Sequence, residues 1–302
     1  MINTLTKLYN KLFNQSKYQK YKSNEKLAKK LNFYNIEIKE KLEKIQDKLY
    51  GNNEINFTHS GHLGDIIYSL PLVQEISKSH DCNFYIRTNK KMILNYENHP
   101  SGDVMINHKT ANLLIPLLRR QKYLKIVDVY KGERIDIDLD LFRDMPININ
   151  FHSVRWYAHL AGVNLDMNKK FLDVDENLSM KNKIVIMRSP RYRNPFINYD
   201  ILKNVNNIVC VGLKSEFEDL KKNIPNLEFY NCRNFLEMAE IIKSSKFFIG
   251  NLCFAYSVAE ALKVNRLLET CPDFPVVFPI GGKAFDFYHQ IHFKKFFDVL
   301  NS

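Results

Sequence analysis

The sequence predicts an α/β protein made of two successive halves, each built around a parallel sheet. Short apolar runs of strand length alternate with longer stretches of helix length from residue 54 to residue 300. A polar and charged segment at residues 164–183 interrupts this alternation once. Strands that alternate with helices are typical of parallel sheets covered on both faces. We therefore expect two Rossmann-like domains, at residues 54–168 and 182–302, after a basic helical extension at residues 1–53.

Length and composition agree with one large or two medium globular domains. The chain has 302 residues, of which 45% are hydrophobic and only ten each are glycine and proline. No apolar run reaches the roughly 20 residues that span a bilayer. The N-terminus lacks the pattern of a secretory signal, and the five cysteines lack metal-ligand spacing. These features predict a cytoplasmic protein, either fully soluble or peripheral at the inner membrane face.

The net charge of +11 is concentrated at the N-terminus. Residues 1–50 hold 12 lysines and five acids, so +7 of the total lies there. Apolar residues recur there at helical spacing, first at Ile2, Leu5, Leu8 and Leu12, then at Leu27, Leu31, Tyr34, Ile38, Leu42, Ile45 and Leu49. The spacing predicts two helical stripes separated by a break over residues 14–24. Their expected partner is the body of the protein, a second copy in a homo-oligomer, or an anionic membrane, rather than nucleic acid.

The first half is predicted to contain four strands and three helices. The strands are expected at residues 55–58, 83–87, 126–130 and 135–141, and the helices at residues 65–78, 111–120 and 151–160. The last strand is an alternation of apolar residues with Asp136, Asp138 and Asp140. We interpret it as a strand with its acids in water and its apolar residues inside, rather than as a metal site.

The second half repeats the alternation. Strands are expected at residues 184–187, 208–211, 227–230, 247–249 and 266–269, and helices at residues 216–222, 235–243, 254–262 and about 285–300. Ligands of open α/β sheets bind at the carboxyl ends of the strands. We therefore expect the binding site between the two halves.

The most informative motif is SGHLGDIIYSLP at residues 60–71. It follows a predicted strand and contains a tight glycine turn that opens a helix. The helix N-terminus stabilises the ionised carboxylate of Asp65, which could accept a proton from a hydroxyl group in a cleft. The alternative is that Asp65 only caps its helix. His62, in the same loop, could contact an acceptor or a phosphate.

Three turns of the second half follow strands and suit an anionic ligand. The loop RSPRYRNP at residues 188–195 supplies Arg188, Arg191 and Arg193, which could pair with a diphosphate or be a solvated basic surface. The turn at residues 250–252 opens a helix whose free N–H groups suit a diphosphate. In the third turn, which begins at Gly212, Glu216 could bind ribose hydroxyls or cap its own helix.

Two of these segments resemble the heptosyltransferase-like glycosyltransferases of family 9, which have the GT-B fold. The Gly64-Asp65 turn resembles the opening motif of that family, and the segment from Gly250 resembles its Gly-Asp-Ser/Thr-Gly segment. The chain has Asn251, Cys253 and Tyr256 where the family usually has Asp, Gly and His. The resemblance implies two Rossmann-like domains that face each other across a cleft, with the acceptor in the first and the nucleotide sugar in the second.

The resemblance also implies an activity, namely metal-independent, inverting transfer of a sugar from a nucleotide sugar to a glycan or glycolipid in cell-surface polysaccharide biosynthesis. It requires no cofactor, because arginines and helix N-termini stabilise the leaving diphosphate. Asp65 is the predicted base. The predicted donor site comprises Arg188, Arg191, Arg193, Gly212, Glu216, Gly250, Asn251 and Leu252, and the predicted acceptor side comprises His62, Gly64, Arg155 and His159. Two alternatives stay open, a non-catalytic scaffold protein and a nucleotide-sugar epimerase on the same fold.

Overall fold

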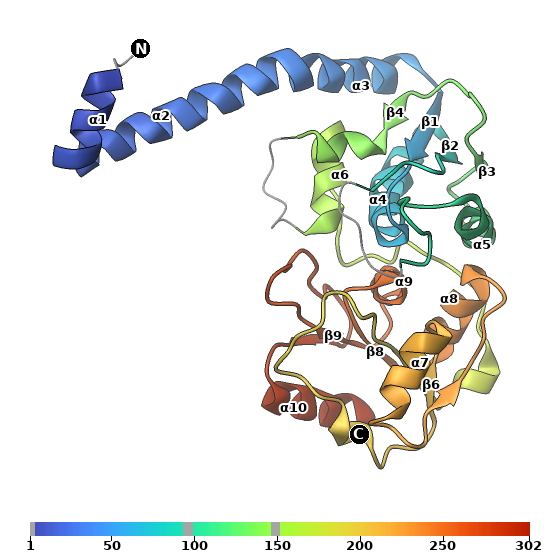
Figure 1. The fold of residues 1–302 in the computed structure, drawn as a ribbon. Coiled ribbons are helices and arrows are strands. Elements are labelled where there is room, and N and C mark those ends of the chain that lie inside the picture. The colour runs from blue at the N-terminus through green and yellow to red at the C-terminus, as the bar shows by residue number, and fades with distance from the viewer. Residues whose placement is uncertain (1–3, 93–98, 146–151) are drawn as a thin grey trace.

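The computed structural model describes residues 4–92, 99–145 and 152–302 and contains two parallel sheets (Figure 1). The first sheet has the order β3-β2-β1-β4 and the second the order β10-β9-β8-β5-β6-β7. The first comprises β1 (Glu54–His59), β2 (Asp81–Ile86), β3 (Ile126–Val129) and β4 (Ile137–Asp138). The second comprises β5 (Ile184–Met187), β6 (Ile208–Cys210), β7 (Glu228–Phe229), β8 (Phe247–Asn251), β9 (Arg266–Glu269) and β10 (Ala284–Phe287).

The central strands are buried on both faces, as expected for parallel sheets. In β1 every residue after Glu54 is buried, and all five residues of β8 are buried. Helices supply the cover: α4 (Leu63–Ile76), α5 (His108–Arg119), α6 (Ser153–Ala161), α7 (Lys214–Lys221), α8 (Phe235–Ser244), α9 (Phe254–Leu262) and α10 (Gln290–Asn301). The mixed α/β class with parallel sheets, which the alternation predicted, is confirmed.

The two sheets are joined by helix packing. Helix α4, which follows β1, lies against α9, which follows β8, and α5 lies against α8 (Figure 1). Buried residues of both pairs, such as Ile66 of α4 and Tyr256 of α9, belong to one continuous apolar core. The first turns of α4 and α9 are also close, because a Cβ atom added to Gly64 would lie 3.9 Å from Ser257 Oγ. The carboxyl ends of β1 and β8 therefore lead into neighbouring helix N-termini.

The N-terminal region forms a long helical arm (Figure 1). It comprises α1 (Thr4–Phe13), α2 (Gln15–Phe33), a π-helical turn (Tyr34–Ile38) and α3 (Lys39–Gly51). The predicted break over residues 14–24 is wrong, since only Asn14 lies outside a helix, and its side chain caps α2 by accepting the Lys17 N–H. Ile38 and Ile45 are buried in the core, so α3 packs on the body. Only α1 and α2 project from it.

The acidic alternation before residue 141 does not form the predicted strand. Only Ile137–Asp138 pairs with β1, and a 3-10 helix, η2, follows at Leu139–Arg143. The prediction that the acids face water is also wrong for Asp136 and Asp140, whose carboxylates accept the backbone N–H groups of Asn56 and Ser60 at 3.0 Å. These bonds satisfy backbone donors that a short β4 leaves unpaired. Within the described ranges, no cluster of acids, histidines or cysteines has the arrangement of a metal site.

Most other predicted boundaries differ from the observed ones by up to three residues, and two differences involve α6 and the C-terminal helix. The helix expected at residues 151–160 begins at Ser153 and ends at Ala161, and Phe151 lies outside the described residues. The C-terminal helix expected from residue 285 begins at Gln290, because residues 284–287 form β10 beside β9. In the part of the chain that the structure describes, none of the helices combines the length and apolar character that crossing a bilayer requires.

Candidate active site

Asp65 lies in the first turn of α4, which follows the carboxyl end of β1 after a short loop at residues 60–62. Its Oδ2 atom accepts a hydrogen bond of 2.6 Å from Nη2 of Arg143. Both side chains are about four-fifths buried, with exposed fractions of 23% for Asp65 and 18% for Arg143. A charge-assisted pair in such a place fixes the direction of the carboxylate.

Arg143 is held between two carboxylates. Its other terminal nitrogen, Nη1, donates to Asp140, and its guanidinium lies over the Phe142 ring, 4.4 Å from the centroid. Gly61 makes room for this arrangement, because an added Cβ would lie 2.1 Å from Arg143 Nη2. The first glycine of the SGHLGD motif, Gly61, is therefore needed to leave space for the Arg143 side chain from η2. Arg143 was not among the residues that the sequence predicted for the site.

Asp140 connects this pair to the loop after β1. It accepts hydrogen bonds from the Ser60 N–H and hydroxyl and lies 3.4 Å from Lys90 Nζ. Burial alone would raise the pKa of Asp140. The charges of Arg143 and of His59, which is protonated in the acid range where Asp140 titrates, outweigh burial and lower the pKa to about 2. The site therefore combines two acidic side chains, Asp65 and Asp140, with two basic ones, Arg143 and Lys90.

His59, the last residue of β1, belongs to this group of polar side chains and contacts Asp140. Its side chain is fully buried, Nδ1 accepts the Gly61 N–H at 2.8 Å, and Nε2 lies 2.9 Å from the Tyr157 hydroxyl. Burial lowers the pKa of His59 to about 4. The imidazole is therefore neutral at pH 7, with its proton on Nε2, and its contact with Asp140 is no ion pair at that pH.

Because His59 is buried in its neutral form, the stability of the fold should depend on pH. Its pKa is about 4 in the folded chain and 6.5 in an exposed histidine, so the unfolded chain binds the proton first as the pH falls. Stability is therefore retained above pH 6.5 and lost progressively from pH 6.5 to pH 4. We expect His59 alone to cost about 2 kcal/mol of unfolding free energy between pH 7.5 and pH 5.

Urea unfolding at the two pH values measures this loss. The His59→Asn variant keeps an acceptor for the Gly61 N–H and cannot titrate, so its stability should change less with pH than that of the parent. His108→Asn, at an exposed position, is the control and should leave the pH dependence unchanged. An unchanged pH dependence in His59→Asn would contradict the assignment of a neutral buried imidazole.

In the second half, the predicted arginines Arg188 and Arg193 pair with carboxylates of the protein. Arg188 donates from Nε and Nη2 to the carboxylate of Glu269, at 2.7 and 2.8 Å. Arg193 donates to Asp219 at 2.7 Å and to the Ser189 carbonyl at 3.0 Å. These pairs fold the loop at residues 188–194 over the carboxyl ends of β5 and β9.

Arg191, in the same loop, affects the pKa of two histidines in the first half of the chain, His62 and His99. Burial lowers the pKa of His62, the Asp65 charge opposes this, and the positive charges of Arg191 and Arg143 lower it further. Burial and Arg191 likewise lower the pKa of His99, to about 4, and the His99 ring lies 5.4 Å from that of His62. The structure therefore brings Arg191 toward the histidines beside Asp65.

Asn251 explains one departure from the resemblance. Its side chain is fully buried at the end of β8. Oδ1 accepts the Ser189 N–H at 2.9 Å, while Nδ2 donates to the carbonyls of Ser189 and Arg191 at 3.0 and 2.7 Å. An aspartate here could not donate to the two carbonyls, so asparagine is the residue that clamps the basic loop.

Several other predicted residues are placed by local packing. Glu216 is buried and caps α7, because its carboxylate accepts the Leu213 N–H at 2.8 Å. Gly212 leaves the space that Glu216 Oε2 occupies. Gly250 packs closely on β5, since an added Cβ would lie 2.8 Å from the Met187 carbonyl oxygen. Leu252 is partly buried before α9.

The predicted acceptor residues fall into two groups. His62 and Gly64 lie at the start of α4, beside Asp65. Arg155 and His159 share one face of α6, as their spacing predicted, but both are exposed. Tyr157, on the opposite face of that helix, is the residue that contacts the buried network, through His59.

Comparison with known proteins gives structural likenesses alone. No model of a known protein family and no curated protein matches the sequence. The E. coli heptosyltransferase WaaC, solved with ADP-2-deoxy-2-fluoro heptose, superposes with a TM-score of 0.53 and 10% identity over 82% of this chain and 99% of WaaC. E. coli ADP-heptose LPS heptosyltransferase II gives 0.53 and 12% identity over 82% of this chain and 98% of that protein.

A glycosyl transferase of family 9 from Veillonella parvula DSM 2008 gives a TM-score of 0.49 and 16% identity over 78% of this chain and 86% of the other. The two E. coli structures, at such low identity, show that this chain shares the fold of the heptosyltransferases. The fold that the resemblance implied is confirmed at this level.

Proposed function

We propose that this protein is an inverting, metal-independent glycosyltransferase that moves a sugar from a nucleotide sugar to a glycan or glycolipid acceptor. The observation that carries the proposal is the hydrogen-bonded Asp65–Arg143 pair at the start of α4, next to the N-terminus of α9. The two halves would face each other across a cleft, as in the GT-B fold. Because WaaC was solved with an ADP-heptose analogue, an ADP-linked sugar is the first donor to test.

Asp65 would act as the base. Arg143 binds Oδ2, and we assign Oδ1 as the atom that accepts the proton of the acceptor hydroxyl. The acceptor oxygen attacks the anomeric carbon from the face opposite the diphosphate, so one C–O bond forms as the other breaks and the configuration inverts. Arg143 would position the carboxylate and prevent it from rotating away from the acceptor.

The leaving diphosphate would be bound by Arg191 and by the N-terminus of α9. The first N–H groups of that helix receive no side-chain cap from Cys253, its N-cap residue, so a phosphate could accept their hydrogen bonds. Arg188 and Arg193 would act mainly by shaping the loop, through Glu269 and Asp219. The positive charge of this loop would take the place of a metal ion in stabilising the leaving group.

A thermal-shift panel of ADP, GDP, UDP and their sugar conjugates tests the donor site, because a ligand that binds the folded state raises its melting temperature. For the best ligand, Arg191→Ala should weaken binding about tenfold, since one charged hydrogen-bond partner of the phosphate is lost. Binding to the parent should also fall with added salt. Arg120→Ala removes an exposed arginine that pairs with Asp175 and should leave affinity unchanged. Equal affinities in both variants and the parent would exclude Arg191 from the phosphate site.

Turnover distinguishes the proposed activity from the two alternatives. A transferase releases the nucleoside diphosphate and does so faster with an acceptor. A scaffold protein would bind the nucleotide sugar without releasing it. An epimerase would change the sugar while the nucleotide sugar stays intact, and it would need no acceptor.

A further inference from the structure

The projecting arm carries nearly all of its charge in its outer part. Residues 1–33 contain eight lysines and one acid, Glu25, whereas residues 34–51 contain four lysines and four acids. The neutral inner part is the part that packs on the body. There Gln46 donates to the Ala161 carbonyl at 3.0 Å, and His80 contacts the Leu49 carbonyl at 2.9 Å. The charge of +7 therefore belongs to α1 and α2.

Helix α1 lies at the far end of this arm (Figure 1). Its apolar face is exposed to solvent. Leu5, Leu8, Tyr9, Leu12 and Phe13 share that face, and each is between 55% and 74% exposed. The polar face rests on α2 instead, where Asn10 is buried and Lys7 lies over the Tyr21 ring and 4.0 Å from Glu25. A helix that packs through its polar side leaves its apolar side for another partner.

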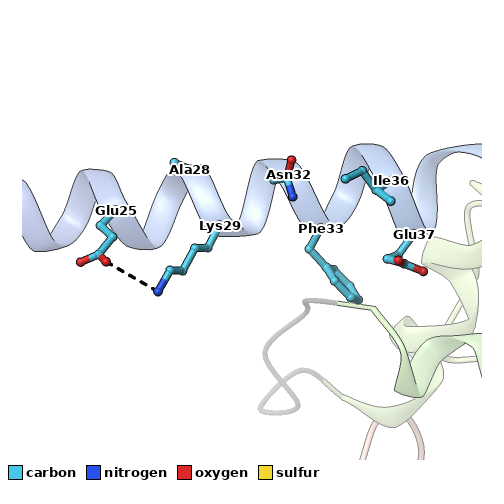
Figure 2. Close-up of a pocket in the computed structure, with 7 residues that line it drawn as sticks. All are labelled: Glu25, Ala28, Lys29, Asn32, Phe33, Ile36 and Glu37. Carbon is cyan, nitrogen blue, oxygen red and sulfur yellow. Dashed lines mark ion pairs between the residues drawn. The ribbon is translucent and has the colours of Figure 1, made fainter. Parts of the chain in front are cut away.

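Figure 2 shows where the arm leaves the body. Glu25, Lys29, Phe33 and Glu37, spaced by four, point to the side of the body, whereas Ala28 and Ile36 lie on the other side of the helix. Glu25 and Lys29 form an ion pair of 3.6 Å across this surface. None of the residues of α2 (Gln15–Phe33), all of which the structure describes, is buried.

We infer that α1 and α2 form a docking element for an anionic membrane surface. The apolar face of α1 would enter the headgroup region in the plane of the membrane, and the lysines of α2 would attract anionic lipids. Neither signal is strong alone, but an apolar face combined with a basic stretch gives stable and reversible attachment. This inference does not depend on the proposed function, although a glycolipid acceptor would lie in the same membrane.

A second copy of the chain fits these observations less well. A coiled coil would need the full stripe from Leu27 to Leu49, and its inner part, from Ile38 onward, already packs on the body. Only Leu27, Leu31 and Tyr34 of that stripe remain outside, which is less than two heptads. Two arms with a charge of +7 each would also repel one another.

Vesicle flotation of the full-length protein tests the inference. The protein should float with vesicles of phosphatidylcholine containing about one-third phosphatidylglycerol, remain below with pure phosphatidylcholine, and dissociate as salt is added. Leu8→Gln with Leu12→Gln, which changes the apolar face, should reduce the bound fraction about tenfold. Lys17→Gln with Lys20→Gln and Lys26→Gln should reduce it by at least as much.

The matched control is the triple variant Lys109→Gln, Lys181→Gln and Lys203→Gln, which removes the same charge from exposed positions of the body. It should float like the parent. Equal loss in both triple variants would show that net charge alone attracts the vesicles and would overturn the assignment to the arm. Light scattering tests whether a second copy of the chain binds α1 instead. If the parent is a dimer, does not float, and becomes a monomer in the Leu8 and Leu12 variant, a second copy covers α1 and the membrane assignment is wrong.

Discussion

Replacing Asp65 with asparagine should abolish sugar transfer while the protein still binds its nucleotide. Asparagine keeps the size of the side chain and can still accept a hydrogen bond from Arg143, but it cannot accept the proton of the attacking hydroxyl. General base catalysis contributes about 10²–10⁴-fold to a rate, so the loss in turnover should lie in that range. The measurement is the release of nucleoside diphosphate, with binding followed separately by calorimetry.

The fold should tolerate this change, because Arg143 retains Asp140 as a partner. Asp81→Asn provides the matched control: it makes the same chemical change in the first half, at a carboxylate that is 60% exposed and pairs with Lys125. That variant should retain the turnover of the parent. If Asp65→Asn turns over within a factor of three of the parent, Asp65 is not the base, and its role is limited to the ion pair with Arg143.

The alternation of apolar runs with helical stretches was sufficient to predict the sheets. The predicted bounds of β5, α9 and β9 coincide with the observed ones, because each is a compact apolar run flanked by polar or turn residues. Strand β10 was missed because Ala284–Phe287 has one acid and two aromatics and reads equally well as the start of a helix. Pairing with β9 decides between the two, and pairing is a tertiary interaction that periodicity does not report.

The site was predictable only in part. A motif identified Asp65, since the glycine turn and the helix start are local in sequence. Arg143 had no such signal, because the bond that gives it a role joins residues 78 positions apart. The sequence showed that Asn251 differs from the aspartate usual in the resembling family, but it could not show why. The explanation is that its side chain donates to the carbonyls of Ser189 and Arg191, about 60 residues away. All three arginines of the basic loop were expected to contact a ligand directly, and only the structure shows the carboxylates that pair with Arg188 and Arg193.

Loss of Glu269 should strongly destabilise the second half of the protein. Its side chain is fully buried at the end of β9. It accepts four hydrogen bonds, two from Arg188 and one each from the Asn194 N–H and the Tyr199 hydroxyl, all between 2.6 and 2.9 Å. Glu269→Ala would leave the Arg188 guanidinium, only 13% exposed, without its counter-ion.

We therefore expect Glu269→Ala to lower the free energy of unfolding by about 3–5 kcal/mol, the usual cost of an uncompensated buried charge. Urea unfolding measures it. Glu228→Ala removes a carboxylate that is 55% exposed and pairs with Lys183, so this control should cost no more than about 1 kcal/mol. Because most of the cost comes from the stranded guanidinium, adding Arg188→Met to Glu269→Ala should recover part of the lost stability. A double variant no more stable than Glu269→Ala would show instead that the bonds to Asn194 and Tyr199 make the larger contribution.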